Sequence, residues 1–303
     1  MINNNCSDSL EILIDKESGL TVKKILRNIY NFSSRGVRRL KKRKFILLND
    51  KKVKTSRKVK KGDKLKVLFK YEKLNYKAQK GKLDILYEDG DLLILNKPPF
   101  IVVHPTKTHK KDTLANYIAN YFKKNNVRKK IRFVNRLDMD TSGIIIIAKN
   151  SYAHQYVQKQ IESKTIKKKY KAIVDKSLDL KEGIINKPIG KEKKGDICRK
   201  VLEDGKKSIT KYKTIKKFKN YTLVDLDLIT GRTHQIRVHF SSLGNPLLGD
   251  KLYGTKSDFI NRQALHSYYL KINVPRKKEN IEISSKLPND MLNALKKMRW
   301  IYE

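Results

Sequence analysis

Acidic residues and cysteines are scarce in this chain, and each shortage excludes a class of protein. Asp and Glu number 30 among 303 residues, against 71 Lys and Arg, which gives a formal net charge of +41. Cys6 and Cys198 form no C-x-x-C pair, so the sequence offers neither a disulfide framework nor a structural zinc site. No run approaches 18 consecutive apolar residues, and the first residues carry no basic signal region, so we expect a cytoplasmic protein without a membrane span.

The excess of positive charge predicts a polyanionic partner. An A/T-rich genome enriches lysine, but it does not disfavour the codons of Asp and Glu, and cations outnumber anions more than twofold. We therefore interpret the charge as selection for a polyanion. Hydrophobic residues make up 39% of the chain, which is enough for a packed core, and the length suggests two domains.

The charge is unevenly distributed along the chain. Residues 18–70 hold 20 Lys and Arg against two Asp, a net charge of +18, whereas the other 250 residues carry +23. Residues 71–82 follow neither a helical nor a strand period and are typical of a linker. We therefore expect a small basic α+β module over residues 10–70, then this linker, and a second domain over residues 83–303.

Helical periodicity and capping signals describe the basic module. Apolar residues recur at i, i+3, i+4 and i+7 over residues 22–29 and predict a first helix. Ser33 and Ser34 would cap a second helix over residues 35–44, and strands are expected over residues 45–48 and 65–69.

This pattern resembles the small RNA-binding module named after ribosomal protein S-four, in which the second helix lies against the RNA backbone. The alternative is a solvated basic helix without a partner. The resemblance implies that RNA is contacted by Arg35, Arg38, Arg39, Lys42 and Arg43.

Strand signals dominate the second domain. Helices are expected over residues 112–122 and 153–161. Strands are expected over residues 84–87, 92–96, 100–104, 143–149, 166–174, 212–215, 221–229 and 234–240. Their mixed order predicts an α+β fold with a mixed, largely antiparallel sheet flanked by helices, and not a doubly wound parallel sheet.

Common catalytic templates are missing from this domain. It has no G-x-S-x-G, no G-x-x-x-x-G-K-[ST] and no G-x-G-x-x-G, and its histidines show no metal-ligand spacing. We therefore expect no metal and no cofactor. What remains is a polar turn over residues 135–143 that leads into an apolar strand. Asp138 or Asp140 could serve chemistry there, or could simply cap the turn through the amides of Thr141 and Ser142.

Two further clusters stand out. Tyr170 shares an apolar strand face with Ala172 and Val174, which is typical of a core residue. In the expected strand over residues 234–240, Arg237 and His239 would share one face. His234 is more typical of a structural histidine than of a base.

Together the three clusters resemble the RluA class of pseudouridine synthases. The nucleophile signature of that class, R-L-D-x-x-T-S-G, matches residues 136–143. Its K-x-Y-x-A-x-V strand matches residues 168–174, and its G-R-[ST]-H-Q-[IL]-R-V-H matches residues 231–239. The resemblance runs in order over about residues 84–275, with N-K-P at residues 96–98 and L-G-N-P-L-L-G-D at residues 243–250 among the matching segments.

This resemblance implies roles for four residues. Asp138 would be the nucleophile, Tyr170 the ring that stacks on the target base, and Arg237 the cation paired with the nucleophile. Arg136 would help to hold the RNA where the base has left. Asn135 stands where the class often has His, which leaves the subgroup and the target site open.

The chemistry agrees with these roles. One nucleophile in a dry pocket suffices to break a glycosidic bond and re-form a bond at carbon-5, and a nearby cation keeps a buried carboxylate ionised. Extracting the base costs a few kcal/mol, which an aromatic face and an Arg can offset. We therefore predict an RNA pseudouridine synthase, an intramolecular transferase that acts as a monomer on structured RNA.

Three questions stay open at this point. Ribosomal RNA of the large subunit, or an assembling ribosomal subunit, is the expected substrate, and transfer RNA is the alternative. A non-catalytic RNA-binding or ribosome-assembly factor would explain the charge equally well, but not the set of Asp138, Tyr170 and Arg237. Whether Asp138 attacks the sugar or the base ring is not decided by the sequence.

Overall fold

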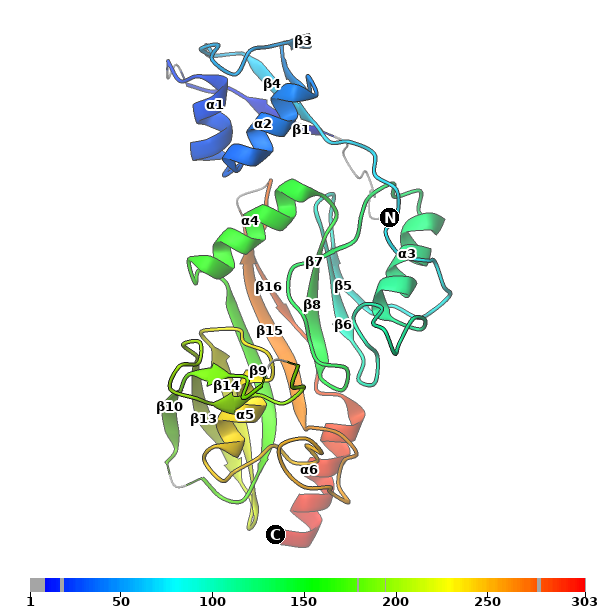
Figure 1. Cartoon of the computed structure of the whole chain (residues 1–303), viewed down its shortest axis with the longest axis vertical. Helices are drawn as coiled ribbons and strands as arrows, with labels where there is room; N and C mark the ends of the chain where they lie inside the picture. Colours follow the sequence, from blue (N-terminus) through cyan, green and yellow to red (C-terminus); the bar gives the residue numbers. More distant parts are fainter. Residues whose placement is uncertain (1–8, 17–18, 179, 194, 277–278, 303) are drawn as a thin grey trace.

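The computed structural model describes residues 9–16, 19–178, 180–193, 195–276 and 279–302. The expectations about Cys6 and the first residues fall outside this part of the chain. A small N-terminal sheet with its helices lies at one end of the long axis, above a larger sheet (Figure 1). No helix in the described ranges is long and apolar enough to cross a membrane.

The N-terminal sheet is antiparallel, in the order β1-β4-β2-β3. Its elements are β1 (Ser9–Leu13), α1 (Val22–Lys24), the π-helix η1 (Ile25–Ile29), α2 (Ser34–Lys42), β2 (Ile46–Leu48), β3 (Lys51–Lys52) and β4 (Lys64–Leu68). Alternate strand residues point into a core shared with the helices, so that Leu65 and Val67 are fully buried beside Val22 and Leu26.

Local capping explains the helices of this part. The first predicted helix is one α-helical turn continued by η1, and it ends before Asn31, whose φ of 59° is left-handed. Ser33 caps α2 by accepting a hydrogen bond from the Gly36 amide at 3.0 Å, so the predicted basic helix and its cap are confirmed.

The segment over residues 71–82 contains no helix or strand. It packs against residues 131–132 of the second domain. Glu72 accepts two hydrogen bonds of 2.7 Å from Arg132, and the Asn75 side chain pairs with the backbone of Ile131.

The larger sheet has the order β10-β13-β14-β9-β15-β8-β6-β5, with β16 paired to β15 and β7 to β8. Among the described strands only β8 and β15 pair in parallel, so the predicted mixed, largely antiparallel α+β fold is confirmed. The strands are β5 (Ile85–Glu88), β6 (Leu92–Lys97), β7 (Arg132–Phe133), β8 (Ser142–Ala148), β9 (Lys167–Asp175), β10 (Glu182–Asn186), β13 (Ile209–Lys217), β14 (Tyr221–Leu228), β15 (Leu265–Asn273) and β16 (Asn280–Ser284), with the separate pair β11 (Ile189–Gly190) and β12 (Lys200–Val201).

Strand β8 is buried on both faces, which places it at the centre of the fold. All seven of its residues are buried. On one face its side chains pack in the cluster that contains α3 (Leu114–Lys124), and on the other in the cluster that contains α4 (Ser151–Glu162). The remaining helices are α5 (Gln235–Ser241) and α6 (Asn289–Tyr302). A strand covered on both faces reads as a continuous apolar run, as this one does.

Two predicted strands are wrong. Residues 100–104 form a loop because the carbonyls of Val102 and Val103 accept hydrogen bonds from the first amides of α3 instead of from a neighbouring strand. Residues 234–240 contain helix α5, not a strand. Every side chain from Gln235 to Phe240 is buried, so the alternating apolar residues did not report a strand period.

Candidate active site

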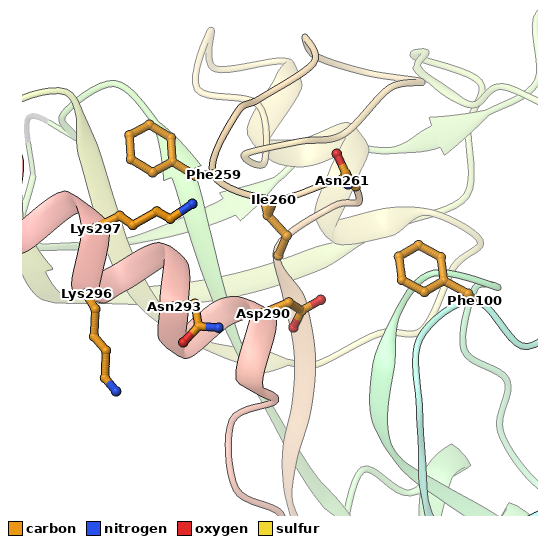
Figure 2. Close-up of a pocket in the computed structure, with 8 residues that line it drawn as sticks. All are labelled: Phe100, Phe259, Ile260, Asn261, Asp290, Asn293, Lys296 and Lys297. Carbon is orange, nitrogen blue, oxygen red and sulfur yellow. The ribbon is translucent and has the colours of Figure 1, made fainter.

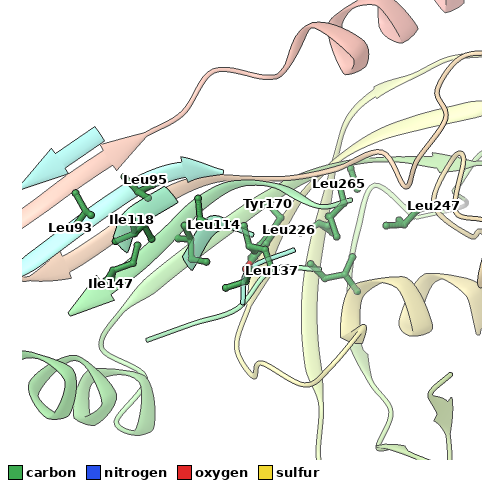
Figure 3. Packing of buried hydrophobic residues seen from close by; sticks show 14 of the residues in the cluster. Leu93, Leu95, Leu114, Ile118, Leu137, Ile147, Tyr170, Leu226, Leu247 and Leu265 are labelled. Atoms are coloured by element: carbon green, nitrogen blue, oxygen red, sulfur yellow. The ribbon is translucent and has the colours of Figure 1, made fainter. Parts of the chain in front are cut away.

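The nucleophile predicted from the sequence lies in the turn between β7 and β8. Leu137, one residue earlier, is buried in the same hydrophobic cluster as Tyr170 and Leu226, and so anchors the turn (Figure 3). The Thr141 amide donates to the Asp138 carbonyl at 3.1 Å and closes the turn. The Asp138 side chain remains 28% exposed at the start of β8. It is therefore accessible, in a turn that leads into the buried strand β8.

Arg237 is fixed between two carboxylates. Its Nη1 donates to Asp138 Oδ2 at 3.1 Å, while Nε and Nη2 each donate to Asp250 at 2.7 Å. Asp250 is fully buried, and its Oδ1 also accepts from the Leu252 and Tyr253 amides. Burial opposes the charge of Arg237, but the two carboxylates outweigh it and raise the guanidinium pKa above its ordinary value. Arg237 is thus a permanent, oriented cation beside Asp138.

Tyr170 lies on β9 between Leu226 of β14 and Ser267 of β15. The side chain is only 5% exposed and belongs to the large hydrophobic cluster, as expected for a core residue. Burial raises the pKa of Tyr170 to about 12, the charge of Asp138 acts in the same direction, and a hydrogen bond with Ser267 opposes it. Its ring is therefore a neutral phenol, close enough to Asp138 to feel its charge.

Gly143 allows β8 to approach β15 closely. Its φ is 111°, and a Cβ at this position would lie 2.1 Å from the Ser267 carbonyl oxygen. One residue earlier, Ser142 Oγ lies 2.9 Å from His266 Nδ1. The last residue of the nucleophile signature is therefore required by the backbone and not by the chemistry.

Buried cations support the turn from within the protein. Lys97 Nζ donates to the carbonyls of Pro98, Ile101 and Met139 at 2.8, 3.0 and 2.7 Å. Arg262 Nη1 donates to the Asp140 carbonyl at 2.9 Å.

The sequence did not assign a role to Lys97, Arg262 or Asp250. The only signals were the family-like segments that contain Lys97 and Asp250, whereas Arg262 lies outside every motif.

Replacing Lys97 with methionine should destabilise the fold by about 2–4 kcal/mol, because three buried carbonyls lose their donor. Burial lowers the pKa of Lys97 to about 7, against the attraction of Asp140. The unfolded chain keeps its proton up to the ordinary pKa of 10.5, so the stability of the natural protein rises between pH 7 and 10.5. Urea denaturation should therefore show a larger difference between the two proteins at pH 9.5 than at pH 6. An equal difference in the free energy of unfolding at both pH values would contradict the lowered pKa of Lys97.

His234 connects Asp138 to a tyrosine. Its Nε2 lies 3.8 Å from Asp138 Oδ1, and its Nδ1 lies 2.8 Å from the Tyr253 hydroxyl. The Tyr253 ring in turn lies under the Arg237 guanidinium at 5.0 Å. Burial lowers the pKa of His234, although the negative charge of Asp138 acts to raise it.

His239 takes no part in this site. It contacts Thr210 Oγ1 at 2.9 Å and the Lys187 carbonyl at 3.0 Å. The predicted shared face of Arg237 and His239 is wrong, since residues two apart on a helix lie about 200° apart around its axis.

The structure places the predicted RNA-binding residues at two separate locations. Arg136 is exposed next to the nucleophile turn, where burial and the Arg136 charge lower the pKa of His104. Asn135 instead faces β8, because its Oδ1 accepts from the Ile146 amide at 2.8 Å. The five predicted cations in and after α2 are all exposed, and Arg39 among them bonds to Ser151 of α4, the helix that follows the far end of β8 from Asp138.

A pocket of about 590 Å³ opens between Phe100 and α6, and none of residues 135–143 is among its lining residues. Figure 2 shows Phe100 on one side of it and α6 on the other. Asp290 in its wall pairs with Arg262 at 2.6 Å, and Arg262 reaches the Asp140 carbonyl. Aromatic rings, amides and ammonium groups of the kind that bind unstacked nucleotides line it. The lining residues are Phe100, Phe259, Ile260, Asn261, Asp290, Asn293, Lys296 and Lys297.

The sequence over residues 91–242 matches the family described as RNA pseudouridylate synthase. The chain belongs to this family. An uncharacterized RNA pseudouridine synthase of Bacillus subtilis (strain 168) is 40% identical over 288 residues, which cover 94% of this chain and 95% of that protein. The ribosomal large subunit pseudouridine synthase D of Buchnera aphidicola subsp. Acyrthosiphon pisum (strain APS) is 37% identical over 230 residues, 71% of this chain and 73% of that protein.

A solved structure agrees with the family. The human RNA pseudouridylate synthase domain containing 1 has a TM-score of 0.55 at 27% identity and covers 68% of this chain and 83% of its own. The RluA-class resemblance of the three sequence clusters is thereby confirmed. The chain is an RNA pseudouridine synthase, an isomerase.

Proposed function

We propose that this synthase isomerises uridines of large-subunit ribosomal RNA with Asp138 as its nucleophile. The observation that carries the proposal is the Asp138 carboxylate, accessible at the start of a buried strand and bonded to an Arg237 that Asp250 already holds in place. A protein that only binds RNA has no use for an accessible carboxylate paired with a buried arginine. The large-subunit synthase of Buchnera aphidicola supports the choice of substrate.

The residues divide the work of the reaction. The uridine leaves the RNA stack, and Arg136, exposed beside the turn, takes its place against the RNA. Asp138 attacks the nucleotide and forms a covalent bond with it, the bond from the sugar to N1 breaks, the sugar rejoins at carbon-5, and the bond to Asp138 breaks and frees the carboxylate. Carbon-5 then loses its proton and N1 gains one, so no oxidant or reductant is needed. Arg237 holds the Asp138 carboxylate in place, and the neutral ring of Tyr170 stacks on the base.

We also propose that residues 10–70 form an RNA-binding domain of the S-four type, joined by residues 71–82 to a catalytic domain over residues 83–303. The exposed cations of α2 support it, because within the described ranges they form no ion pair with an acidic side chain. The enzyme would work as a monomer in the cytoplasm.

Mapping pseudouridine in total RNA from cells with and without the gene tests the substrate. We expect at least one uridine of the large-subunit ribosomal RNA to lose its modification when the gene is absent. Loss confined to transfer RNA would replace the substrate, and no loss in any RNA would contradict the proposal.

Substituting Tyr170 separates a stacking ring from a core residue. Phenylalanine should preserve RNA binding because it keeps the ring, whereas leucine should weaken capture of the base by about 1–3 kcal/mol. RNA affinity and single-turnover rates measure this, with urea denaturation to report stability. If Tyr170→Leu loses stability but neither affinity nor rate, the residue belongs to the core alone. If Tyr170→Phe loses rate but not affinity, the hydroxyl takes part in proton transfer.

Removing charge from α2 tests RNA docking. Replacing Arg38, Lys42 and Arg43 with glutamine should weaken RNA binding and flatten the dependence of log affinity on log salt by roughly 0.7 to 0.9 for each phosphate that the protein no longer neutralises. A matched variant removes the same charge from exposed sites in or after β13, at Lys211, Lys213 and Lys219. Equal salt dependences in the two variants would show that α2 does not dock RNA.

A further inference from the structure

Helix α4 packs against two separate hydrophobic cores. Ala153 and Val157 are fully buried against the large sheet, in the cluster that contains Ile144 and Ile146 of β8. Tyr152 belongs instead to the core of the N-terminal module and is only 3% exposed. The module therefore uses a side chain of the catalytic part to complete its own core.

Aromatic stacking forms the centre of this interface. The Tyr152 ring stacks on Phe32 with their centroids 4.5 Å apart and an angle of 19°, and it faces Phe69 at 6.2 Å. Its hydroxyl donates to the Pro275 carbonyl at 3.0 Å. Phe32 precedes α2 and Phe69 follows β4, so one tyrosine contacts two segments of the module that are far apart in sequence.

Hydrogen bonds fix the orientation of the module. Gln155, on the next turn of α4, accepts from the Ser33 amide at 3.1 Å and donates to the Asn31 carbonyl at 2.9 Å. Arg39 of α2 donates to Ser151 Oγ at 3.1 Å. Because Ser33 is the residue that caps α2, these bonds set the direction of the basic helix relative to α4.

A second contact holds the module at its first strand. Arg276 donates through Nε and Nη2 to the buried Asp91 at 2.7 and 3.0 Å, and through Nη1 to the Ser9 carbonyl at the start of β1. The same guanidinium lies 5.4 Å from the centre of the Phe69 ring. Two contacts at separate points on a rigid body prevent it from pivoting.

We propose that this interface fixes the position of the module relative to the Asp138 turn. The enzyme then modifies uridines at a set distance from the RNA element docked on α2. Strand β8 leads from the Asp138 turn directly to α4, and its seven residues span about 23 Å at about 3.3 Å each. Tyr152, Gln155 and Arg276 are then specificity-determining residues far from the chemistry. This inference rests on the proposed docking of RNA by α2.

The test compares Tyr152→Ala with Tyr152→Phe in the full-length enzyme. The substrate is large-subunit ribosomal RNA purified from cells that lack the gene, and pseudouridine is quantified at every uridine under single-turnover conditions. Tyr152→Ala should lower the ratio of target to off-target modification at least tenfold and leave RNA affinity within threefold. Tyr152→Phe keeps the stacked ring and should retain the natural ratio. A natural ratio in both variants would overturn the inference.

Two further variants decide the matter if Tyr152→Ala does not fold. Gln155→Leu removes both hydrogen bonds to residues 31–33 and should also lower the ratio, while an unchanged ratio would overturn the inference. A six-residue Gly-Ser insertion after the exposed Lys70 lengthens the connection. If the interface holds the module, the insertion should leave the set of modified uridines unchanged. A changed set would mean that the module is positioned by the linker, and would also overturn the inference.

The two proposals fail in different ways. If the α2 charge variant binds with an unchanged salt dependence, RNA docking itself is wrong. If that variant behaves as expected and Tyr152→Ala keeps the natural ratio of target to off-target modification, RNA docking on α2 stands and only the fixed position of the module is wrong.

Discussion

Replacing Asp138 with asparagine is expected to reduce single-turnover isomerisation by several orders of magnitude while changing RNA affinity by no more than a few-fold. The amide fills the same volume and can still face Arg237, but it cannot attack the nucleotide. The measurement is pseudouridine formed per enzyme at saturating enzyme concentration, with binding followed separately.

Asp140→Asn is the matched control, because it alters the second carboxylate of the same turn. Arg262 bonds to the backbone carbonyl of Asp140, and that contact survives the substitution. We expect this variant to keep most of its rate. A rate above about one hundredth of the natural value in Asp138→Asn would contradict its role as a covalent nucleophile.

Asp250→Asn should damage both stability and turnover, although Asp250 does not touch the reacting atoms. Two hydrogen bonds of 2.7 Å join it to Arg237, and its side chain is fully buried. The amide presents a donor to a guanidinium that has only donors, and it leaves a buried positive charge half-compensated. Breaking one partner of such a pair lowers the free energy of unfolding by about 3–5 kcal/mol. We expect at least a hundredfold loss of rate, since Arg237 no longer holds Asp138.

Urea denaturation and single-turnover rates check this expectation, with Asp290→Asn as the comparison. Asp290 also pairs with a buried arginine, but that arginine, Arg262, keeps its hydrogen bonds to the carbonyls of residues 140, 263 and 265 when the carboxylate is lost. Asp290→Asn should therefore lose less stability and less rate. Equal losses in the two variants would show that the Asp250 pair is only structural.

The sequence indicated the candidate catalytic pair, Asp138 and Arg237, but not the residues that support it. Asp138 and Arg237 are 99 positions apart, yet both fall in recognisable clusters, and the structure brings them to 3.1 Å. The supporting residues act across similar separations without a local pattern. Arg262 reaches Asp140 over 122 positions, and neither residue's neighbours indicate it. Only the folded chain shows that Lys97 bonds to the carbonyl of Met139.

The fold divides in the same way. Strands β6, β8 and β14 carry long apolar runs or alternation, so their sequence alone predicts them. Strand β15 was not predicted, because its buried polar residues His266 and Ser267 are explained only by partners on β8 and β9. Helix α5 was mistaken for a strand because all of its first six side chains are buried and show no period.

Gly143 adds a steric requirement to the nucleophile signature, because β8 and β15 leave no room for a side chain at this position. Any side chain there meets the Ser267 carbonyl, 2.1 Å from the position of a Cβ. Strand β15 would have to retreat, and Ser267, the hydrogen-bond partner of Tyr170, would move with it. A relative that keeps Asp138, Tyr170 and Arg237 but carries alanine at this position therefore has the same side chains in the wrong relative positions. We expect such a chain to bind RNA and to leave its uridines unchanged.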